Sequence, residues 1–308
     1  MLSTKRKYNT QPNIITNSTD EMSVIEKRLV YLAINQMDAS INMETGSFKD
    51  LEFKIPISAL GDTNYDRIRK AVFKLQSRAV VLIDDRPKRL LQRIIPFPAV
   101  RIENEVITLK MYSDIIPYFL ELKKGFTKYE LQAALALTSV YSQKLYEHFS
   151  RWKDKEKWSI SFTDLQTLLA AENYRYADFK RRCLDCAVLE INEKTDLTIL
   201  YNTEKEGRSV GIIHFTIKIK TRQDLQEANA IVEEGLAELS SMKPSEVAVI
   251  VQHLLHKYTL TKSQKESIIS TTSLFNKFVE LDFKIVNKII DAQDPTRYIA
   301  SSLFKNKT

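Results

Sequence analysis

Residues 177–191 combine an apolar stripe with a block of positive charge. The apolar side chains recur at steps of three and four positions, which keeps them on one face of a helix. They are Phe179, Cys183, Cys186 and Ala187. Asp178 is placed to cap this helix, and Lys180, Arg181 and Arg182 crowd its first turn. The helix dipole disfavours positive charge there, whereas a phosphate or a guanine against the turn favours it, so the pattern predicts a DNA recognition helix.

The segments on either side of this helix complete a winged helix. Residues 158–162 alternate as a short strand, and residues 164–171 form the helix before a turn at 172–176. After the basic helix, residues 197–201 and 212–218 alternate as strands around a polar turn. That turn contains Lys205, Gly207 and Arg208. The pattern therefore predicts a helix-turn-helix followed by a hairpin with a basic tip.

The first half of the chain shows the same order of elements. Ser18 and Glu21 are spaced as a capping box that opens a helix reaching Gln36. The strand, helix and hairpin strands that follow are expected at residues 53–57, 65–78, 80–83 and 90–95. The basic residues of that helix and of the hairpin tip are Arg67, Arg69, Lys70, Lys74, Lys88 and Arg89. We predict a duplication of architecture and an α+β fold with two tandem winged-helix domains.

The remaining segments set the predicted domain boundaries. One more strand is expected at 102–111, and helices at 115–122, 128–137 and 140–152, with Thr127 and Glu130 as a second capping box. After Lys220 the pattern is helical, with runs at 223–239, from Pro244, through Lys262, at 274–292 and at 298–304. The predicted domains are a flexible N-terminal arm at 1–17, which is either loose or grips DNA phosphates, winged-helix domain 1 at 18–124, winged-helix domain 2 at 125–221 and a helical C-terminal region at 222–308.

The motifs of the second half resemble those of a known family. In and after the basic helix stand Phe179-Lys180-Arg181-Arg182, Glu190-Ile191-Asn192, Thr195, Gly207-Arg208 and Phe215. Before it stand Phe126-Thr127-Lys128-Tyr129, Leu137, Ser139, Tyr141-Ser142, Leu145-Tyr146 and Trp158. This ordered set resembles the second winged-helix domain of plasmid replication initiators of the RepA, RepB and RepE type. The resemblance is dense over residues 126–220 and fainter before them.

The resemblance implies a function and a set of partners. In that family a monomer binds direct repeats of the plasmid origin, the iterons, to start replication. A homodimer joined through the first domain binds an inverted repeat and represses its own gene. By resemblance, the partners are double-stranded DNA and host replication proteins such as the replicative helicase. The chain would then be plasmid-encoded and act in the bacterial cytoplasm.

Composition and charge agree with a DNA-binding protein. With 308 residues, 44% of them hydrophobic, the chain is long enough for about two domains with buried cores. No apolar run approaches the roughly 18 residues of a membrane span, and the N-terminus lacks an apolar signal region, so we expect a soluble cytoplasmic protein. The formal charge is +7. Residues 222–308 contain 11 Lys plus Arg and 11 Asp plus Glu, which leaves 35 Lys plus Arg and 28 Asp plus Glu for residues 1–221. We therefore expect a polyanion partner to bind residues 1–221.

The common catalytic motifs are missing from the sequence. Its six glycines form no phosphate-binding loop, and its four histidines form no His-apolar-His metal triplet. Cys183 and Cys186 have C-x-x-C spacing, but two further zinc ligands are missing, and we interpret both as small residues of the helix core. We therefore predict a protein that is not an enzyme and uses no metal or cofactor.

The residue types suggest separate roles at the DNA. Arg pairs bidentately with guanine, so Arg181 and Arg182 are the predicted base readers. Tyr174 and Tyr176, just ahead of the helix, are aromatic candidates for DNA contact. The predicted phosphate contacts are Lys180, Lys205 and Arg208, with Arg69, Lys70 and Lys74 in the equivalent place in the first domain.

Two other functions compete with the initiator. A transcriptional repressor with tandem winged helices and a C-terminal sensor, but no initiator role, shares all of the DNA-binding chemistry. Only the family pattern favours the initiator over it. A nicking replication enzyme would need a tyrosine near a metal triplet, and the sequence contains no such triplet.

Overall fold

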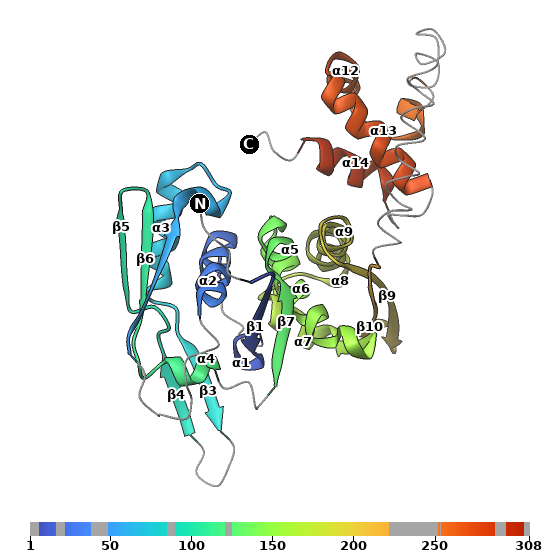
Figure 1. Cartoon of the computed structure of the whole chain (residues 1–308). Helices are drawn as coiled ribbons and strands as arrows, with labels where there is room; N and C mark the ends of the chain where they lie inside the picture. The colour runs from blue at the N-terminus through green and yellow to red at the C-terminus, as the bar shows by residue number, and fades with distance from the viewer. Residues whose placement is uncertain are drawn as a thin grey trace. The chain divides into compact units, whose positions relative to one another are not determined.

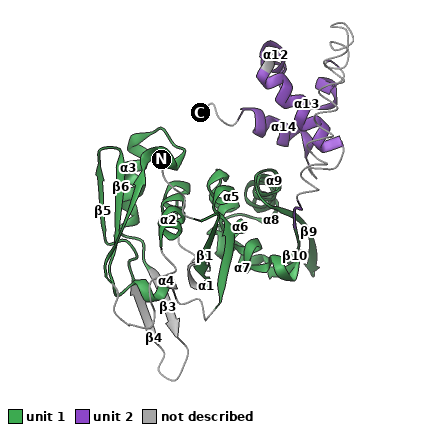
Figure 2. Ribbon diagram, in the orientation of Figure 1, with its two compact units in different colours: residues 1–218 green, residues 219–308 purple. Residues whose placement is uncertain are grey.

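The computed structural model describes most of the chain. The described residues are 6–16, 22–37, 49–84, 90–120, 125–221, 252, 254–286 and 294–304. The chain divides into two compact units, residues 1–218 and 219–308 (Figure 1, Figure 2). In the first unit we call the described residues between 22 and 120 module 1, and those between 125 and 218 module 2. Among the described residues, no helix is long and apolar enough to cross a membrane.

Module 1 packs helices against a three-stranded sheet. Its elements are α2 (Val24–Gln36), β2 (Leu51–Pro56), a 3-10 turn (Ile57–Leu60), α3 (Tyr65–Leu75), β3 (Val80–Asp84), β4 (Leu90–Ile94), β5 (Ala99–Glu103), β6 (Val106–Met111) and α4 (Ile116–Leu120). The sheet has the antiparallel order β2-β6-β5, and β3 pairs with β4 as a separate hairpin. The apolar stripe of α3 closes the core through Ile68, Val72 and Leu75, which are buried. The predicted strand, basic helix and hairpin are confirmed.

Module 2 contains the second winged helix. Its elements are β7 (Phe126–Glu130), α5 (Leu131–Ala136), α6 (Val140–Trp152), a 3-10 turn (Lys153–Lys155), β8 (Lys157–Ser161), α7 (Phe162–Leu169), α8 (Tyr176–Phe179), a π-helical turn (Lys180–Leu184), α9 (Asp185–Lys194), β9 (Leu197–Glu206) and β10 (Ser209–Ile219). β10 lies between β8 and β9 in one sheet. Aromatic rings fill the core, since the Phe215 centroid lies 5.3 Å from that of Trp158 and 4.9 Å from that of Phe149. The predicted helix-turn-helix and hairpin are confirmed.

The N-terminal segment differs from the flexible arm predicted for residues 1–17. Strand β1 (Tyr8–Pro12) pairs antiparallel with β7, and a short helix α1 (Asn13–Thr16) follows it. Asn9 and Gln11 on the inner face of β1 are buried. These buried residues are polar, so no apolar alternation marks the strand in the sequence. Residues 1–5 and 17 lie outside the described residues.

The start of module 2 also differs from the prediction. The helix expected at 128–137 is a strand up to Glu130, and α5 begins only at Leu131. Thr127 does not cap a helix, because its hydroxyl faces the N-terminal segment and donates to Asn13 Oδ1 at 2.9 Å. Pairing with β1 therefore overrides the local capping pattern.

Two boundaries in module 1 are corrected as well. Helix α2 begins at Val24 with a capping box of Ser23 and Glu26, whereas the box predicted from residue 18 lies outside the described residues. The single strand expected at 102–111 is a hairpin of β5 and β6. Its turn is made by Asn104 and Glu105, which have φ of 49° and 60°. Asn is among the residues that tolerate this left-handed conformation.

The second unit is helical where it is described. Its longer helices are α12 (Lys262–Ser270), α13 (Thr272–Val286) and α14 (Pro295–Phe304). In its interior the buried Asp282 carboxylate accepts hydrogen bonds from Lys257 Nζ at 2.7 Å and from the Tyr258 hydroxyl. The helix expected through Lys262 is confirmed, and the one expected at 274–292 is confirmed as far as Val286, because residues 287–293 lie outside the described residues. The last helix, expected at 298–304, begins earlier, at Pro295. The helices expected at 223–239 and from Pro244 lie outside the described residues.

Candidate nucleic-acid interface

The predicted recognition helix runs unbroken from Tyr176 to Lys194, through α8, the π-helical turn and α9. It starts earlier than predicted: Arg175 occupies the N-cap position, and Asp178 lies inside the first turn. Phe179 and Cys183 are fully buried, as the apolar stripe predicts. Cys186 is only half-buried, with its thiol 3.2 Å from the main-chain oxygen of Arg181, and both cysteines are free thiols.

The turn ahead of this helix is held by a side-chain amide. Gln166 of α7 donates from Nε2 to the main-chain oxygens of Tyr174 at 2.7 Å and Ala171 at 3.2 Å. Phe162 at the start of α7 packs edge-on against Tyr176 and Phe179, with centroids 5.4 and 5.2 Å apart. These contacts fix the angle between the two helices, so that the basic turn projects from a rigid support.

The three basic residues of this helix differ in how far they reach solvent. Arg181 Nη2 lies 2.6 Å and Arg182 Nε 3.7 Å from the same Asp178 Oδ1, and the two arginine side chains are 51% and 55% exposed. Lys180 is drawn toward α9 by an ion pair of 3.0 Å with Asp185 and is 31% exposed. Two guanidiniums are therefore displayed together, while the ammonium is partly neutralised.

The two candidate tyrosines have different surroundings. The Arg182 guanidinium lies over the Tyr174 ring, 5.7 Å from its centroid. Tyr176 packs into the junction of α7 and α8, and burial raises the pKa of its hydroxyl. Tyr174 is therefore part of the basic face, whereas Tyr176 mainly supports it.

The wing places its basic residues at a tight turn. Gly207 has φ of +64°, a left-handed conformation that favours glycine, and Arg208 completes the turn between β9 and β10. Lys205 and Arg208 are exposed. At the base of the wing, His214 lies 3.0 Å from Glu204 and 2.8 Å from Ser159 Oγ. The strands are longer than predicted, which carries the basic tip farther from the core.

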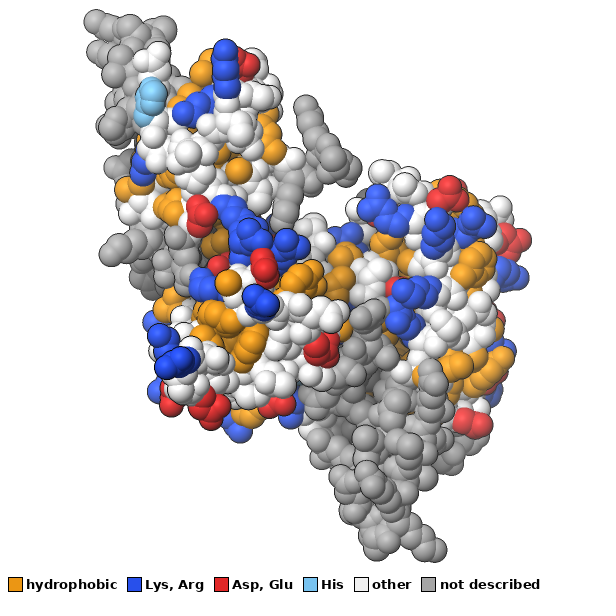
Figure 3. Space-filling view, turned by 180° about the vertical axis from the view of Figure 1, so that it is seen from behind, with side chains coloured by type: hydrophobic (Ala, Val, Ile, Leu, Met, Phe, Trp, Pro, Cys, Tyr) orange, Lys and Arg blue, Asp and Glu red, His pale blue; other side chains and the backbone are white. Residues whose placement is uncertain are grey.

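The first basic helix, α3, also exposes its cations. Arg67 and Arg69 make long ion pairs of 3.5 Å, with Asp62 ahead of the helix and with Asp66 in its first turn. Lys70 and Lys74 are exposed and make no ion pair with another described residue. Lys88 and Arg89 lie outside the described residues. Figure 3 shows Lys and Arg side chains gathered on one face of the first unit in two groups, one over each module.

Sequence reasoning missed three exposed residues of these surfaces. Arg175 stands at the start of the basic helix of module 2, exposed and without an acidic partner among the described residues. Tyr65 and Phe73 of α3 are 50% and 51% exposed beside its basic residues. Their position off the apolar stripe of α3 is the signal that could have found them. Among the described residues, no group of three or more His, Cys, Asp or Glu could hold a metal ion.

Comparison with known proteins finds matches over both modules. The family model described as "Initiator Replication protein, WH1" matches residues 9–150, and the model "Initiator Rep protein, WH2" matches residues 161–217. The PI protein of Escherichia coli is 28% identical over 247 residues, 66% of this chain and 80% of that protein. A replication initiation protein of Escherichia coli is 29% identical over 134 residues, 41% of each chain.

A solved structure shares the fold. The crystal structure of Pi initiator protein in complex with iteron DNA matches with a TM-score of 0.59 at 23% identity, covering 70% of this chain and 98% of that chain. Neither family model extends past residue 217, so the second unit lies outside both.

Proposed function

We propose that this chain, which belongs to the family of plasmid replication initiators with two winged-helix domains, binds direct repeats in the origin of its own plasmid and thereby starts replication. The observation that carries the proposal is the pair of basic helices. α3 and the helix from Tyr176 to Lys194 each present exposed cations on the same unit. The Pi initiator is described with iteron DNA, and we propose the same class of double-stranded target here.

In module 2 the geometry favours a division between base and phosphate contacts. Arg181 and Arg182 would enter the major groove, where a guanidinium can pair bidentately with guanine. Tyr174 would hold Arg182 in place through the ring beneath its guanidinium. Lys205 and Arg208 at the wing tip would contact the phosphate backbone. Lys180 would contribute less, because Asp185 already partly neutralises it.

In module 1, α3 would enter a neighbouring groove. Lys70 and Lys74, which have no acidic partner among the described residues, would contact phosphates. Arg67 and Arg69 would exchange their weak ion pairs for DNA contacts. Phe73 offers an apolar surface of the kind that contacts a thymine methyl group.

The oligomeric and regulatory parts of the proposal rest on the family resemblance. We propose that a monomer binds the direct repeats and that a homodimer binds an inverted repeat to repress its own gene. Host replication proteins such as the replicative helicase would then be recruited at the origin. Because this DNA lies in the bacterial cytoplasm, we place the protein there. A repressor without an initiator role shares the DNA chemistry but lacks the support of the family match.

The test is binding of the purified full chain to DNA flanking its own gene, by footprinting and by mobility shift during a salt titration. Direct-repeat and inverted-repeat fragments are assayed separately, and light scattering gives the mass of each complex. We expect a monomer on the direct repeat and a dimer on the inverted repeat. Binding to the inverted repeat alone would favour the repressor. Equal affinity for both fragments and for scrambled DNA would overturn both functions.

A further inference from the structure

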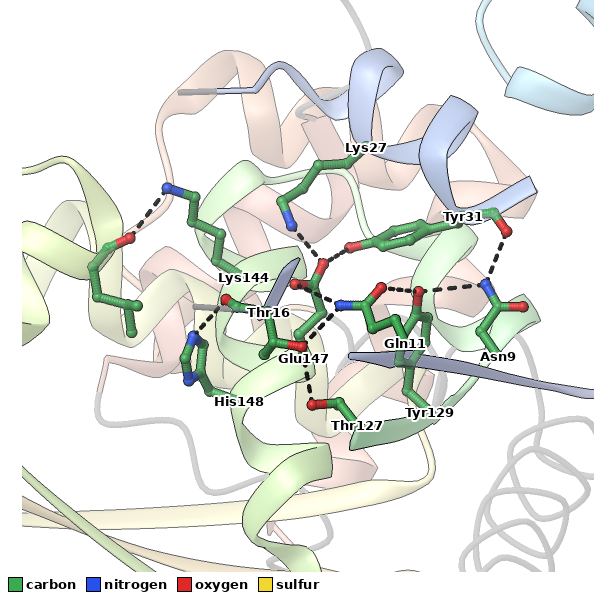
Figure 4. Close-up of polar contacts among 11 residues, drawn as sticks. Asn9, Gln11, Thr16, Lys27, Tyr31, Thr127, Tyr129, Lys144, Glu147 and His148 are labelled. Carbon is green, nitrogen blue, oxygen red and sulfur yellow. Dashed lines mark hydrogen bonds and ion pairs between the residues drawn. The ribbon is translucent and has the colours of Figure 1, made fainter. Parts of the chain in front are cut away.

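A buried polar cluster joins the two modules (Figure 4). Its centre is Glu147 of α6, whose carboxylate accepts hydrogen bonds from the Lys27 ammonium and the Tyr31 hydroxyl, both on α2. Glu147 is 2% exposed and Lys27 is 8% exposed. Removing either partner would leave the other charge buried and uncompensated, so the pair specifies the position in which α2 packs on α6.

Strand β1 supplies further partners to this cluster. Gln11 lies between the modules: its Nε2 is 3.5 Å from Glu147 Oε2, and its Oε1 accepts from the Tyr129 hydroxyl at 2.8 Å. Asn9 Nδ2 donates to the main-chain oxygen of Tyr31 at 2.8 Å and lies 3.3 Å from the Tyr129 hydroxyl. The inner face of β1 therefore bonds to module 1 through α2 and to module 2 through β7 and α6.

The two ends of the same segment are fastened as well. Arg6 donates to main-chain oxygens at the C-terminal end of α2, including that of Ile34 at 3.3 Å, and its own main-chain oxygen accepts from Asn35 Nδ2 at 2.8 Å. At the other end, Thr16 Oγ1 donates to Thr127 Oγ1 of β7 at 2.9 Å. Residues 6–16 are thus hydrogen-bonded to both modules.

We propose that residues 6–16 are a brace that fixes the angle between the two DNA-reading helices, so that the two modules bind as one rigid body. The inference rests on the proposed function in that the fixed angle matters for a site read by both modules. In a rigid pair, binding costs no further freedom of one module relative to the other, whereas two loosely linked modules lose that relative freedom when both bind. The cost is selectivity for spacing: a rigid pair fits one separation between the two parts of its site.

The brace can be tested without DNA by measuring the distance between the modules. Spin labels are placed at Ser77→Cys in module 1 and Thr163→Cys in module 2, both exposed positions, in a Cys186→Ala background that keeps the buried Cys183. The test variant is Asn9→Ala with Gln11→Ala. The matched control is Thr10→Ala, on the same strand between them, whose side chain makes no hydrogen bond to the cluster among the described residues.

Pulsed electron–electron double resonance should give one narrow distribution of distances between the two labels for the wild type and for Thr10→Ala. The Asn9→Ala, Gln11→Ala variant should give a distribution about twofold wider, because the modules then move as linked bodies. An equally narrow distribution in the double variant would overturn the brace. If the double variant does not melt cooperatively, Gln11→Ala alone, which removes the bonds to Glu147 and Tyr129, replaces it under the same criterion.

The second measurement uses DNA and separates the brace from the proposed function. The probe is one repeat protected in the DNA flanking the gene, with about five base pairs, half a helical turn, inserted between the parts protected by each module. The wild type should lose about 100-fold in affinity on insertion, and the double variant about tenfold or less. Equal losses would overturn the brace. A wild type that binds no repeat specifically would overturn the proposed function, and the label distances would still decide the brace.

Discussion

Replacing Arg181 by alanine tests base reading at the second recognition helix. The exposed Arg181 guanidinium is paired with Asp178 at 2.6 Å, an ion pair worth at most about 1 kcal/mol at an exposed site. A bidentate contact with guanine contributes about 1–3 kcal/mol of discrimination. After release of Asp178, the net loss on Arg181→Ala should be about 1–2 kcal/mol, or roughly 5–30-fold in affinity for the specific repeat. Affinity for scrambled DNA should change far less.

Fluorescence anisotropy with labelled repeat and scrambled duplexes, over a salt titration, measures both quantities. Arg181→Lys is the matched control, because it keeps the charge but not the bidentate fork. Arg181→Lys should keep the slope of log affinity against log salt concentration and lose the preference for the repeat duplex over the scrambled duplex. Lys205→Ala at the wing tip should instead weaken both duplexes alike and lower the slope by about 1. Equal weakening of both duplexes by Arg181→Ala would make Arg181 a phosphate contact and refute the assigned base contact.

Three further predictions concern the scaffold of this surface. Asn192→Ala removes both hydrogen bonds between the Asn192 amide and the main chain of Ile199, at 2.9 and 2.6 Å, so the unfolding free energy measured in denaturant should fall by about 1–3 kcal/mol. Burial and the nearby Lys27 and Arg151 charges lower the pKa of His148 from 6.5 to about 3. The unfolded chain therefore binds a proton that the folded chain does not, so the unfolding free energy should fall as the pH drops below about 6.5. Urea titrations should show a flatter pH dependence of the unfolding free energy for His148→Gln. Gln166→Leu removes the hydrogen bonds to the turn before the helix that starts at Tyr176. Affinity for the specific repeat should fall by about tenfold, and amide hydrogen exchange at that turn should accelerate. Unchanged exchange would contradict the role of the amide.

The apolar and basic patterns predicted both basic helices, α3 and the helix from Tyr176 to Lys194. Ile68 and Val72 in one module, and Phe179 and Cys183 in the other, recur at helical spacing and are buried as expected. The sequence did not determine whether Asp178 is the N-cap, because a polar residue near the start of a helix can lie either at the cap or inside the first turn. Tertiary contact decided it: the packing of Phe162 against the first turn extends the helix back beyond Asp178.

The family motif beyond the basic run turns out to contain scaffold residues. The Glu190 carboxylate accepts from the main-chain N–H of Thr138 at 2.8 Å and of Ser139 at 3.3 Å, which fastens the start of α6 to α9. Thr195 Oγ1 donates to Ile191 O at 2.8 Å and accepts from Leu197 N at 3.2 Å at the entry to β9. Glu190 and Thr195 therefore hold the helix and the wing together, so part of the motif identifies the fold through its scaffold.

The junction of the modules could not be predicted from local patterns. The helical pattern of α2 predicts one apolar face and one solvated face, yet Lys27 and Arg28 are buried because α2 lies between two cores. The partner of Lys27 is Glu147, 120 positions away, and neither charge signals the other in the sequence. Such a pair contributes little net stability relative to apolar residues of similar volume, because desolvation offsets the attraction. Its contribution is geometric: it specifies how α2 packs on α6, and it depends on a distant contact that no local periodicity records.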